Sequence, residues 1–264
     1  MKLPAQRYVS SELAHFVGKR LEVEEQYRLL VKILGEGWLS HPPHTPNISG
    51  NLIVNASAGF SSNHEYNPQM VCFCDIPIAD LGIHVSKYSP FGLSFSKDFI
   101  VQKGGCPVFY IPLQSRVRAF TPIDQRDSDW WVRVQQSGKI DDLEVSGPKS
   151  EYFDRMMQGY LSLMQSLVKS HDPFAGLPGN TPGSLSLYEL QRFLDFHVFS
   201  FIKFYDHEAA DDNDDNHYLE REWRVLGNIE FSLGDVQTVF MPRAFAVRFR
   251  ADCPLYTSQL WLFS

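Results

Sequence analysis

The chain has 264 residues, of which 44% are apolar and 14% aromatic, so it can bury a sizeable core. It carries 24 lysines and arginines against 31 aspartates and glutamates, a net charge of −7 that disfavours contact with nucleic-acid phosphates. No apolar run reaches the length of a signal peptide or a membrane span, and four cysteines are too few for a disulfide framework. We therefore expect a cytoplasmic protein with free thiols and no membrane association.

The N-terminal part of the chain predicts short strands around one amphipathic helix. Apolar residues spaced three or four apart predict a helix over Val23–Leu34, which Gly35 and Gly37 end. Residues 39–67 are rich in Pro, Gly, Ser, Asn and His, which predicts a long surface loop. Further apolar segments predict strands over Leu13–Val17, Val71–Asp75, Phe91–Ser96 and Pro107–Pro112, a short helix over Ala79–Lys87, and a turn at Gly104 and Gly105.

The C-terminal part predicts two long helices followed by strands. Apolar stripes at helical spacing run over Glu151–Leu167 and Leu185–Tyr205, which makes residues 150–205 a helical insertion. An acidic loop is predicted over residues 206–217, and alternation predicts strands over Tyr218–Leu226 and Ala244–Phe249. The expected fold is a single α+β domain over residues 1–264. It has a mixed, mainly antiparallel central sheet, an N-terminal strand–helix unit, and the two helices inserted before the last strands.

The stretch from Tyr218 to Arg224 combines charges with a strand pattern. On a strand, Glu220, Glu222 and Arg224 share one face, whereas Arg221 lies on the other with Trp223. An isolated buried charge is strongly unfavourable, so these groups must be paired or lie at the sheet rim. Two interpretations stay open: a structural network of ion pairs, and a catalytic carboxylate pair that orients a hydroxyl and stabilises a cationic transition state.

Other polar residues carry weaker signals. Cys72 and Cys74 lack the spacing of a zinc knuckle, so we expect core residues and no metal. Asp75 follows a predicted strand, where a carboxylate caps a turn or contributes to a site. Arg243, Arg248 and Arg250 could form a small basic patch. The acidic loop contains Asp206, Glu208, Asp211, Asp212, Asp214 and Asp215 without the glycine and final glutamate of an EF-hand, so a solvated loop is expected.

Two blocks of sequence resemble the AbiGi family of bacterial abortive-infection proteins. The first is MVCFCDIPIADLGIHVSKYSPFGLSFSKDFIVQKGGCPVFYI over Met70–Ile111, and the second holds FIKFYD and YLEREWRVL within Phe201–Leu226. A weaker similarity to the family extends from LAHFVGKR to ILGEGWL near the N-terminus. The chain departs from the family pattern after Tyr88, where Ser89 and Pro90 stand in place of a glycine. The resemblance implies a role in phage defence with a partner toxin or antitoxin protein.

A second likeness, to ADP-ribosyltransferases, rests on residue order. His15 on a first strand, Ser94 and Ser96 on a middle strand, and Glu220 with Glu222 late in the chain follow the order of groups in those enzymes. The likeness implies that His15 binds the nicotinamide ribose of NAD and that Ser94 and Ser96 line the nicotinamide pocket. Glu222 then stabilises the oxocarbenium-like ribose, because a carboxylate beside developing positive charge lowers the barrier. Glu220 orients the acceptor.

Two hypotheses from different classes follow. The first is an AbiGi-like phage-defence protein with a polar pocket that binds NAD and transfers ADP-ribose. Its pocket is lined by His15, Asp75, Ser94, Ser96, Glu220 and Glu222. The second is a non-catalytic antitoxin that neutralises a toxin encoded beside it, with the acidic loop as a docking site for a basic partner.

Overall fold

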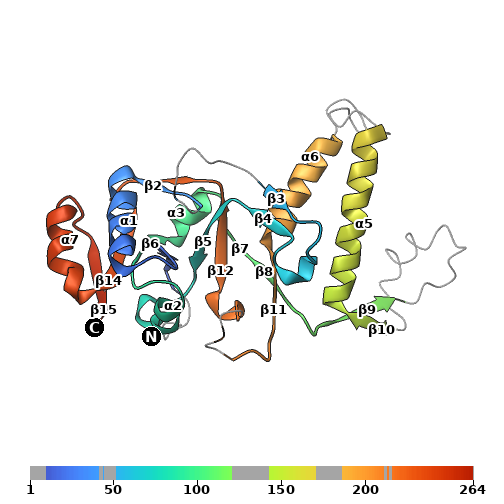
Figure 1. The fold of residues 1–264 in the computed structure, drawn as a ribbon, viewed down its shortest axis with the longest axis horizontal. Helices are drawn as coiled ribbons and strands as arrows, with labels where there is room; N and C mark the ends of the chain where they lie inside the picture. The colour runs from blue at the N-terminus through green and yellow to red at the C-terminus, as the bar shows by residue number, and fades with distance from the viewer. Residues whose placement is uncertain are drawn as a thin grey trace, which may run out of the picture.

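The computed structural model describes residues 10–41, 44, 52–120, 143–170, 186–210, 213 and 216–263. Its centre is a seven-stranded sheet in the order β15-β14-β6-β1-β5-β12-β7 (Figure 1). Every pair in this sheet is antiparallel except β14 with β15, which confirms the mixed, mainly antiparallel α+β fold. The strands are β1 (Glu12–Phe16), β5 (Met70–Cys74), β6 (Gly92–Ser96), β7 (Cys106–Pro107), β12 (Glu222–Leu226), β14 (Val236–Pro242) and β15 (Gln259–Phe263).

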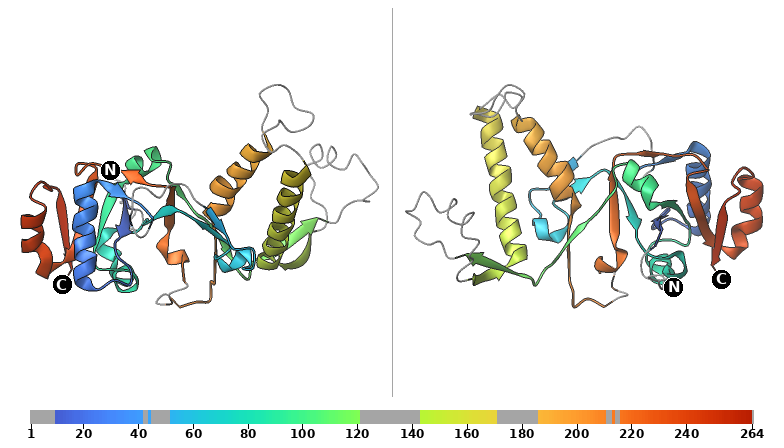
Figure 2. Two further views of the ribbon diagram at one scale, coloured as in Figure 1. Left: turned by 45° about the horizontal axis from the view of Figure 1, so that its top comes forward. Right: turned by 180° about the vertical axis from the view of Figure 1, so that it is seen from behind.

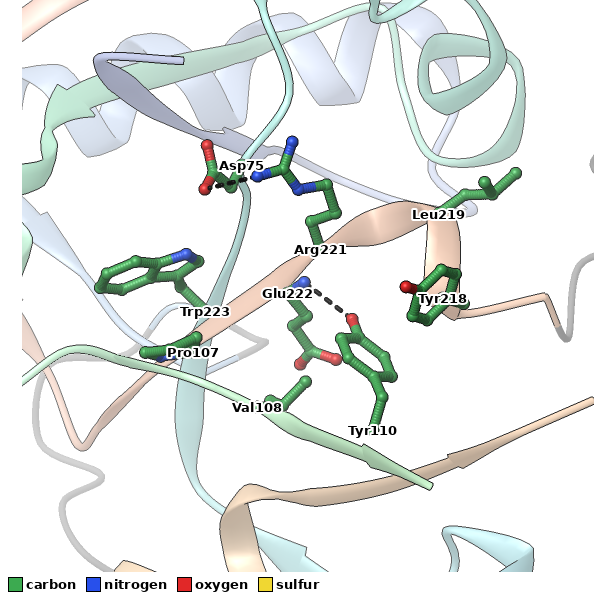
Figure 3. Close-up of a pocket in the computed structure, with 9 residues that line it drawn as sticks. All are labelled: Asp75, Pro107, Val108, Tyr110, Tyr218, Leu219, Arg221, Glu222 and Trp223. Carbon is green, nitrogen blue, oxygen red and sulfur yellow. Dashed lines mark hydrogen bonds and ion pairs between the residues drawn. The ribbon is translucent and has the colours of Figure 1, made fainter. Parts of the chain in front are cut away.

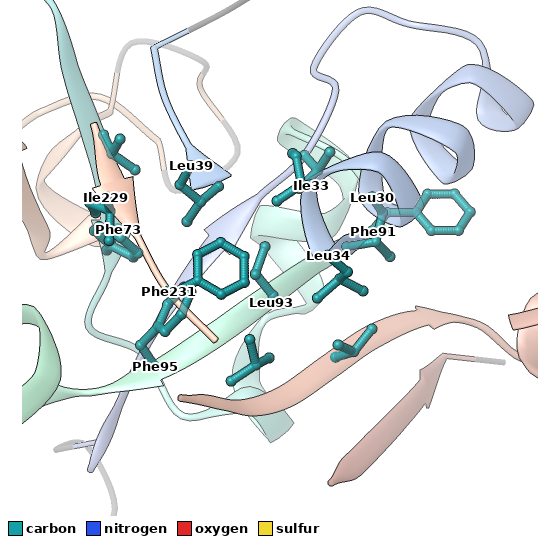
Figure 4. Close-up of a cluster of buried hydrophobic side chains, with 14 of the residues drawn as sticks. Leu30, Ile33, Leu34, Leu39, Phe73, Phe91, Leu93, Phe95, Ile229 and Phe231 are labelled. Carbon is teal, nitrogen blue, oxygen red and sulfur yellow. The ribbon is translucent and has the colours of Figure 1, made fainter. Parts of the chain in front are cut away.

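One face of the sheet packs against α1 (Val23–Glu36) and forms the main core. The helix begins with a capping box between Glu22 and Glu25 and ends at Gly37, whose φ of 70° is the left-handed conformation that glycine adopts without strain. Figure 4 shows Leu30, Ile33 and Leu34 of α1 lying against the sheet. The predicted helix and its end at Gly37 are confirmed, whereas Gly35, also predicted to end it, lies within the helix.

The opposite face of the sheet is covered by a short helical segment. The 3-10 turn η2 (Ile78–Asp80) and α2 (Gly82–Lys87) follow β5, and Leu81 between them packs with Ala14 and Phe240. The helix α3 (Lys97–Gln102) follows β6, and η6 (Arg243–Phe245) with α7 (Ala246–Asp252) joins β14 to β15. Both faces of the central strands are thus buried, which explains their nearly continuous apolar sequences.

A second group of elements has its own small core. Phe60, Met157 and Phe204 lie at its centre, and Figures 1 and 2 place it at the end of the molecule away from α7. Its helical elements are η1 (Phe60–Ser62), α5 (Lys149–Ser170), α6 (Leu187–Arg192), the π-helix η3 (Phe193–Val198) and η4 (Phe199–Phe201). Its strand pairs are β3 (Leu52–Val54) with β4 (Tyr66–Pro68), β8 (Phe109–Pro112) with β11 (Ile202–Tyr205), and β9 (Arg116–Phe120) with β10 (Leu143–Pro148). The remaining pair is β2 (Trp38–Leu39) with β13 (Ile229–Glu230).

Several predicted elements are wrong in part. The predicted loop 39–67 contains β3, η1 and part of β4, while residues 42, 43 and 45–51 lie outside the described part. The predicted helix Leu185–Tyr205 ends at Phe201, and its last residues form β11, because pairing with β8 satisfies the backbone there. The segment Lys97–Gly105 contains a helix as well as the turn.

The predicted strand Ala244–Phe249 is a helix. Phe249 is fully buried, whereas Val247 is 86% exposed. Phe245 and Phe249 lie four residues apart, so in a segment this short the helical and alternating patterns overlap. The neighbouring strand of the sheet is β14, just before it in the chain, which pairs with β6 and with the edge strand β15. Within the part of the chain that the structure describes, no helix has the length and apolar character needed to cross a bilayer.

A tight contact in the sheet gives a stability prediction. A Cβ added at Gly92 would lie 2.2 Å from Cζ of Phe240 and 2.3 Å from the carbonyl oxygen of His15. We expect Gly92→Ala to lower the free energy of unfolding by about 1–3 kcal/mol or more, since the packed interior must shift. Gly35→Ala is the matched control: its Cβ meets nothing within 4 Å, so removing a helical glycine should stabilise by about 0.5–1 kcal/mol. Urea unfolding measures both, and equal effects would contradict the close contact.

Candidate functional site

The candidate site forms where the chain enters β12. The sequence predicted one strand over Tyr218–Leu226, but Tyr218–Glu220 form the 3-10 turn η5 and only Glu222–Leu226 form β12. Between them Arg221 adopts a left-handed conformation, with φ 44° and ψ 51°. This conformation is uncommon for a non-glycine residue and ends the strand, so Glu220 and Glu222 are not neighbours on one pleated face.

A buried lysine brings the two glutamates together nonetheless. Nζ of Lys203, on β11, lies 3.2 Å from Oε2 of Glu220 and 2.7 Å from Oε2 of Glu222. Arg224 completes the group, with Nε 2.8 Å from Oε1 of Glu222. Glu220, Glu222 and Lys203 are all buried. We refer to Lys203, Glu220, Glu222 and Arg224 as the buried ion cluster.

Further donors satisfy Glu220. Its Oε1 accepts hydrogen bonds from Nζ of Lys87, at 3.2 Å, and from the hydroxyl of Tyr88. The same oxygen lies 3.1 Å from Nδ1 of His217. Two of these donors come from α2 and its C-terminal cap, so the cluster also fixes the helix that covers this face of the sheet. Both glutamates therefore have cationic and hydrogen-bonding partners.

The charges of the cluster keep both carboxylates ionised. Burial alone raises the pKa of Glu222, but the guanidinium of Arg224 and the ammonium of Lys203 outweigh it and lower that pKa to about 2. Burial likewise opposes ionisation of Glu220, yet His217, Lys203 and Tyr88 hold its pKa well below the usual range. The same pairing raises the pKa of Lys203 against the effect of its own burial. At neutral pH the cluster consists of full charges, not of carboxylic acids ready to give up a proton.

A pocket of about 410 Å³ opens beside the cluster (Figure 3). Its walls are Asp75, Pro107, Val108, Tyr110, Tyr218, Leu219, Arg221, Glu222 and Trp223. The hydroxyl of Tyr110 accepts the backbone N–H of Glu222 at 2.7 Å, which fixes this aromatic wall to β12. Tyr218 is 51% exposed and stacks on Tyr205 with ring centroids 4.6 Å apart. The size is that of a site for a small ligand or a large side chain.

Asp75 holds two cations at the rim of this pocket. Its Oδ2 lies 2.8 Å from Nζ of Lys97 and 3.4 Å from Nη2 of Arg221. The backbone N–H of Asp75 also donates to the carbonyl of Arg221 at 3.3 Å, which helps to hold Arg221 in its left-handed conformation. One carboxylate is thus shared by two cations at this rim.

The remaining predicted site residues lie away from the pocket. Ala14 pairs with Cys74, and Cys74 pairs with Glu222, so these three side chains share one face of the sheet. His15 therefore points to the opposite face, where its ring lies 5.7 Å from that of Phe73. Nδ1 of His15 lies 2.8 Å from the carbonyl oxygen of Cys72, so it carries the proton of that hydrogen bond. The sheet thus separates His15 from Glu222.

The two serines have structural partners. Ser94 lies on the same face as Glu222 but three strands away, a separation of roughly 14 Å at the usual strand spacing. Its hydroxyl donates to Glu12 at 2.5 Å and accepts the backbone N–H of Thr238 at 3.1 Å. Ser96 caps α3 by accepting the backbone N–H of Phe99. Of the six predicted site residues, Asp75 and Glu222 line the pocket, and Glu220 joins Glu222 in the buried ion cluster.

Several residues of the site were not predicted from the sequence. Lys203 was placed on a helix, and Tyr110 and Lys87 were not singled out. A signal for Lys203 was present, because it is a single cation within the apolar run FIKFY, which indicates a buried charge that needs a partner. Within the described residues, no three or more His, Cys, Asp or Glu side chains are arranged to hold a metal ion.

Comparison with known proteins gives a family. A family model described as "Putative abortive phage resistance protein AbiGi, antitoxin" matches residues 59–246, which is well over half of the chain. The chain belongs to the AbiGi family. The matched region includes β5, α2, β12 and the whole buried ion cluster, so the AbiGi assignment covers the elements that build the site. Comparisons with curated proteins and with solved structures gave no match.

The buried ion cluster predicts a large effect of removing its central cation. We expect Lys203→Met to lower the free energy of unfolding by about 3–5 kcal/mol, because it leaves Glu220 and Glu222 facing each other without their shared cation. Adding Glu222→Gln should recover part of this loss, since one buried charge is then removed. Lys32→Met, at an exposed position of α1, is the control and should stay within about 0.5 kcal/mol. Urea unfolding of Lys203→Met, Glu222→Gln, the double variant and Lys32→Met tests this, and additive losses in the double variant would contradict the coupling.

The lowered pKa values predict acid sensitivity. Burial lowers the pKa of His44 to about 4, with a contribution from nearby His15 and His41, and the pKa of Glu222 is about 2. The unfolded chain binds these protons at higher pH than the folded protein does. Stability should therefore fall from about pH 6.5 to 4 through His44, and from about pH 4.5 to 2 through Glu222. The urea midpoint, measured between about pH 7 and 3, reports this loss of stability. Glu222→Gln should reduce the pH dependence of the midpoint below about pH 4.5 only. A midpoint that does not change with pH would contradict the prediction.

Proposed function

We propose that this AbiGi-family protein acts in phage defence as an antitoxin that binds and neutralises a toxin protein encoded beside it. The observation that carries the proposal is the state of Glu220 and Glu222. Each is buried and each is paired with at least two cationic groups. These carboxylates support the fold, and the exposed ring of Tyr218 lies beside them in the wall of the pocket.

A catalytic role for Glu222 would require its charge to act on a substrate. Its two oxygens are instead engaged by Lys203 and Arg224, whose positive charges already compensate it. Such a carboxylate gives little extra stabilisation to a cationic transition state, since the electrostatic effect depends on unbalanced negative charge aimed at the reacting centre. The geometry of the described residues therefore favours a binding role.

The pocket and its surroundings have the composition of a protein-binding surface. Tyr, Trp and Arg are enriched at the positions that contribute most to binding, and Tyr218, Trp223 and Arg221 all line the pocket. Tyr205 stacks on Tyr218, so the acidic run that starts at Asp206 begins next to this wall. A toxin that inserts a large side chain into the pocket and presents basic residues to the acidic run fits this surface.

The test is co-expression with the neighbouring gene product. Expression of this chain alone should be harmless, and it should rescue growth that the toxin arrests. We expect Tyr218→Ala to weaken capture of the toxin at least about tenfold, because truncating an aromatic anchor at an interface commonly costs more than 1 kcal/mol. Tyr188→Ala, at an exposed tyrosine of α6, is the matched control. Growth arrest by this chain alone, or full rescue and capture by Tyr218→Ala, would contradict the proposal.

A second candidate is an ADP-ribosyltransferase-like activity that uses NAD. It is supported by the position of Glu222 and Asp75, two of the predicted site residues, in the wall of one pocket of about 410 Å³. Incubation of the purified protein with labelled NAD and cell lysate decides between the two functions. Label transfer or NAD cleavage that Glu222→Gln abolishes, with unfolding monitored separately, would support the enzyme and overturn the non-catalytic antitoxin.

A further inference from the structure

The helix α5 carries two apolar or uncharged stripes, and the protein's own core uses only one. The first stripe has buried or half-buried side chains at Phe153, Met157, Tyr160, Met164 and Leu167. The second stripe has only exposed residues, at Tyr152, Met156, Gly159, Leu163, Ser166 and Ser170. Successive residues of the second stripe are four, three, four, three and four apart, which is the spacing of a seam between two packed helices. We call this second set the α5 seam.

The α5 seam lacks the charges of an ordinary solvent-facing helix. Met156 is 52% exposed and Leu163 is 54% exposed, and the 13 residues from 156 to 168 contain no Asp, Glu, Lys or Arg. A helix that faces solvent normally carries charged residues on its outer side. Figures 1 and 2 place α5 at the end of the described structure opposite α7.

Gly159 adds an independent observation. In the middle of a 22-residue helix, glycine costs about 0.5–1 kcal/mol relative to alanine. Within the described part of the chain, nothing lies within 4 Å of the position that its Cβ would occupy, so the chain's own packing gives no reason for glycine. A glycine on an exposed helix face allows another helix to approach closely.

We propose that the α5 seam pairs with the α5 seam of a second copy of this chain, with the two helices antiparallel. In the a–d register of an antiparallel pair, Leu163 of one copy faces Gly159 of the other. The same register places Met156 opposite Ser166 and Tyr152 opposite Ser170. Every layer then combines one large and one small side chain, and the two-fold axis repeats each contact. A parallel pair would place Leu163 against Leu163, which crowds that layer, and Gly159 against Gly159, which leaves a gap.

The charge distribution of α5 is compatible with self-association. The chain has a net charge of −7, so two copies repel each other except through a neutral surface, which the uncharged stretch provides. Glu151 lies in the first turn of α5 and Lys169 in the last. Antiparallel pairing brings the first turn of one copy, with Lys149 and Glu151, to the same end as Lys169 of the other. This inference goes beyond the proposed function and holds whether or not a toxin binds.

The experiment measures the mass of the full chain by analytical ultracentrifugation. A short seam gives a small interface, so we expect a reversible dimer that forms at about 10–100 μM. Leu163→Glu should weaken the dimer at least about tenfold by burying a charge in the seam. The matched control is Val247→Glu, at an 86% exposed position of α7, and it should leave the dimer unchanged. A chain that stays monomeric up to this range, or a dimer that Leu163→Glu leaves intact, overturns the proposal.

Two further variants separate pairing from folding. Gly159→Ala should raise the stability of the monomer and weaken the dimer, which a purely structural glycine would not do. In a mixture of Gly159→Cys and Leu163→Cys chains, oxidation should link position 159 to position 163, as identified by peptide mass. Links of 159 to 159 and of 163 to 163 alone would overturn the antiparallel register. Failure of toxin capture in a chain that still dimerises would affect only the proposed antitoxin function.

Discussion

The ion pairs of Lys203 with Glu220 and Glu222 connect the two halves of the structure. Lys203 lies on β11, which pairs with β8 in the smaller group of elements, whereas Glu222 begins β12 in the seven-stranded sheet. Removing such charges from water costs several kcal/mol for each ion, and the cost is offset only when each has a well-placed partner. The second cation, Arg224, and the donors around Glu220 meet this condition, so the halves are joined in one defined geometry.

The cluster also determines what the neighbouring pocket can do. Glu222 is held in the wall of the pocket by its two cations and by the hydrogen bond from its backbone N–H to Tyr110. Arg221 is held beside it in a left-handed conformation through the Asp75 contacts. Residues in such conformations cluster at functional sites, where the surrounding structure imposes them. The pocket therefore has a wall whose buried charges are compensated from within the fold.

Much of the fold could be predicted because the signals were local. The helix α1 has regular apolar spacing and a glycine at its end, and β1, β5 and β6 have apolar runs bounded by turn residues. The errors occurred where local patterns were ambiguous or where distant pairing decided the outcome. Phe245 and Phe249 fit both a strand and a helix, and Ile202–Tyr205 continue a helical stripe until pairing with β8 makes them a strand. Strand pairing between distant segments leaves no local mark in either segment.

The sequence by itself determined the α+β class, the strands β1, β5 and β6, and the need for partners around Glu220 and Glu222. These properties follow from side-chain periodicity and from the rule that buried charges need partners. Only the tertiary structure decided which partners they have. It placed Lys203 between the two glutamates and His15 on the opposite face of the sheet. The physical reason is that the face of a side chain depends on strand boundaries and register, and a single left-handed residue, Arg221, changes both.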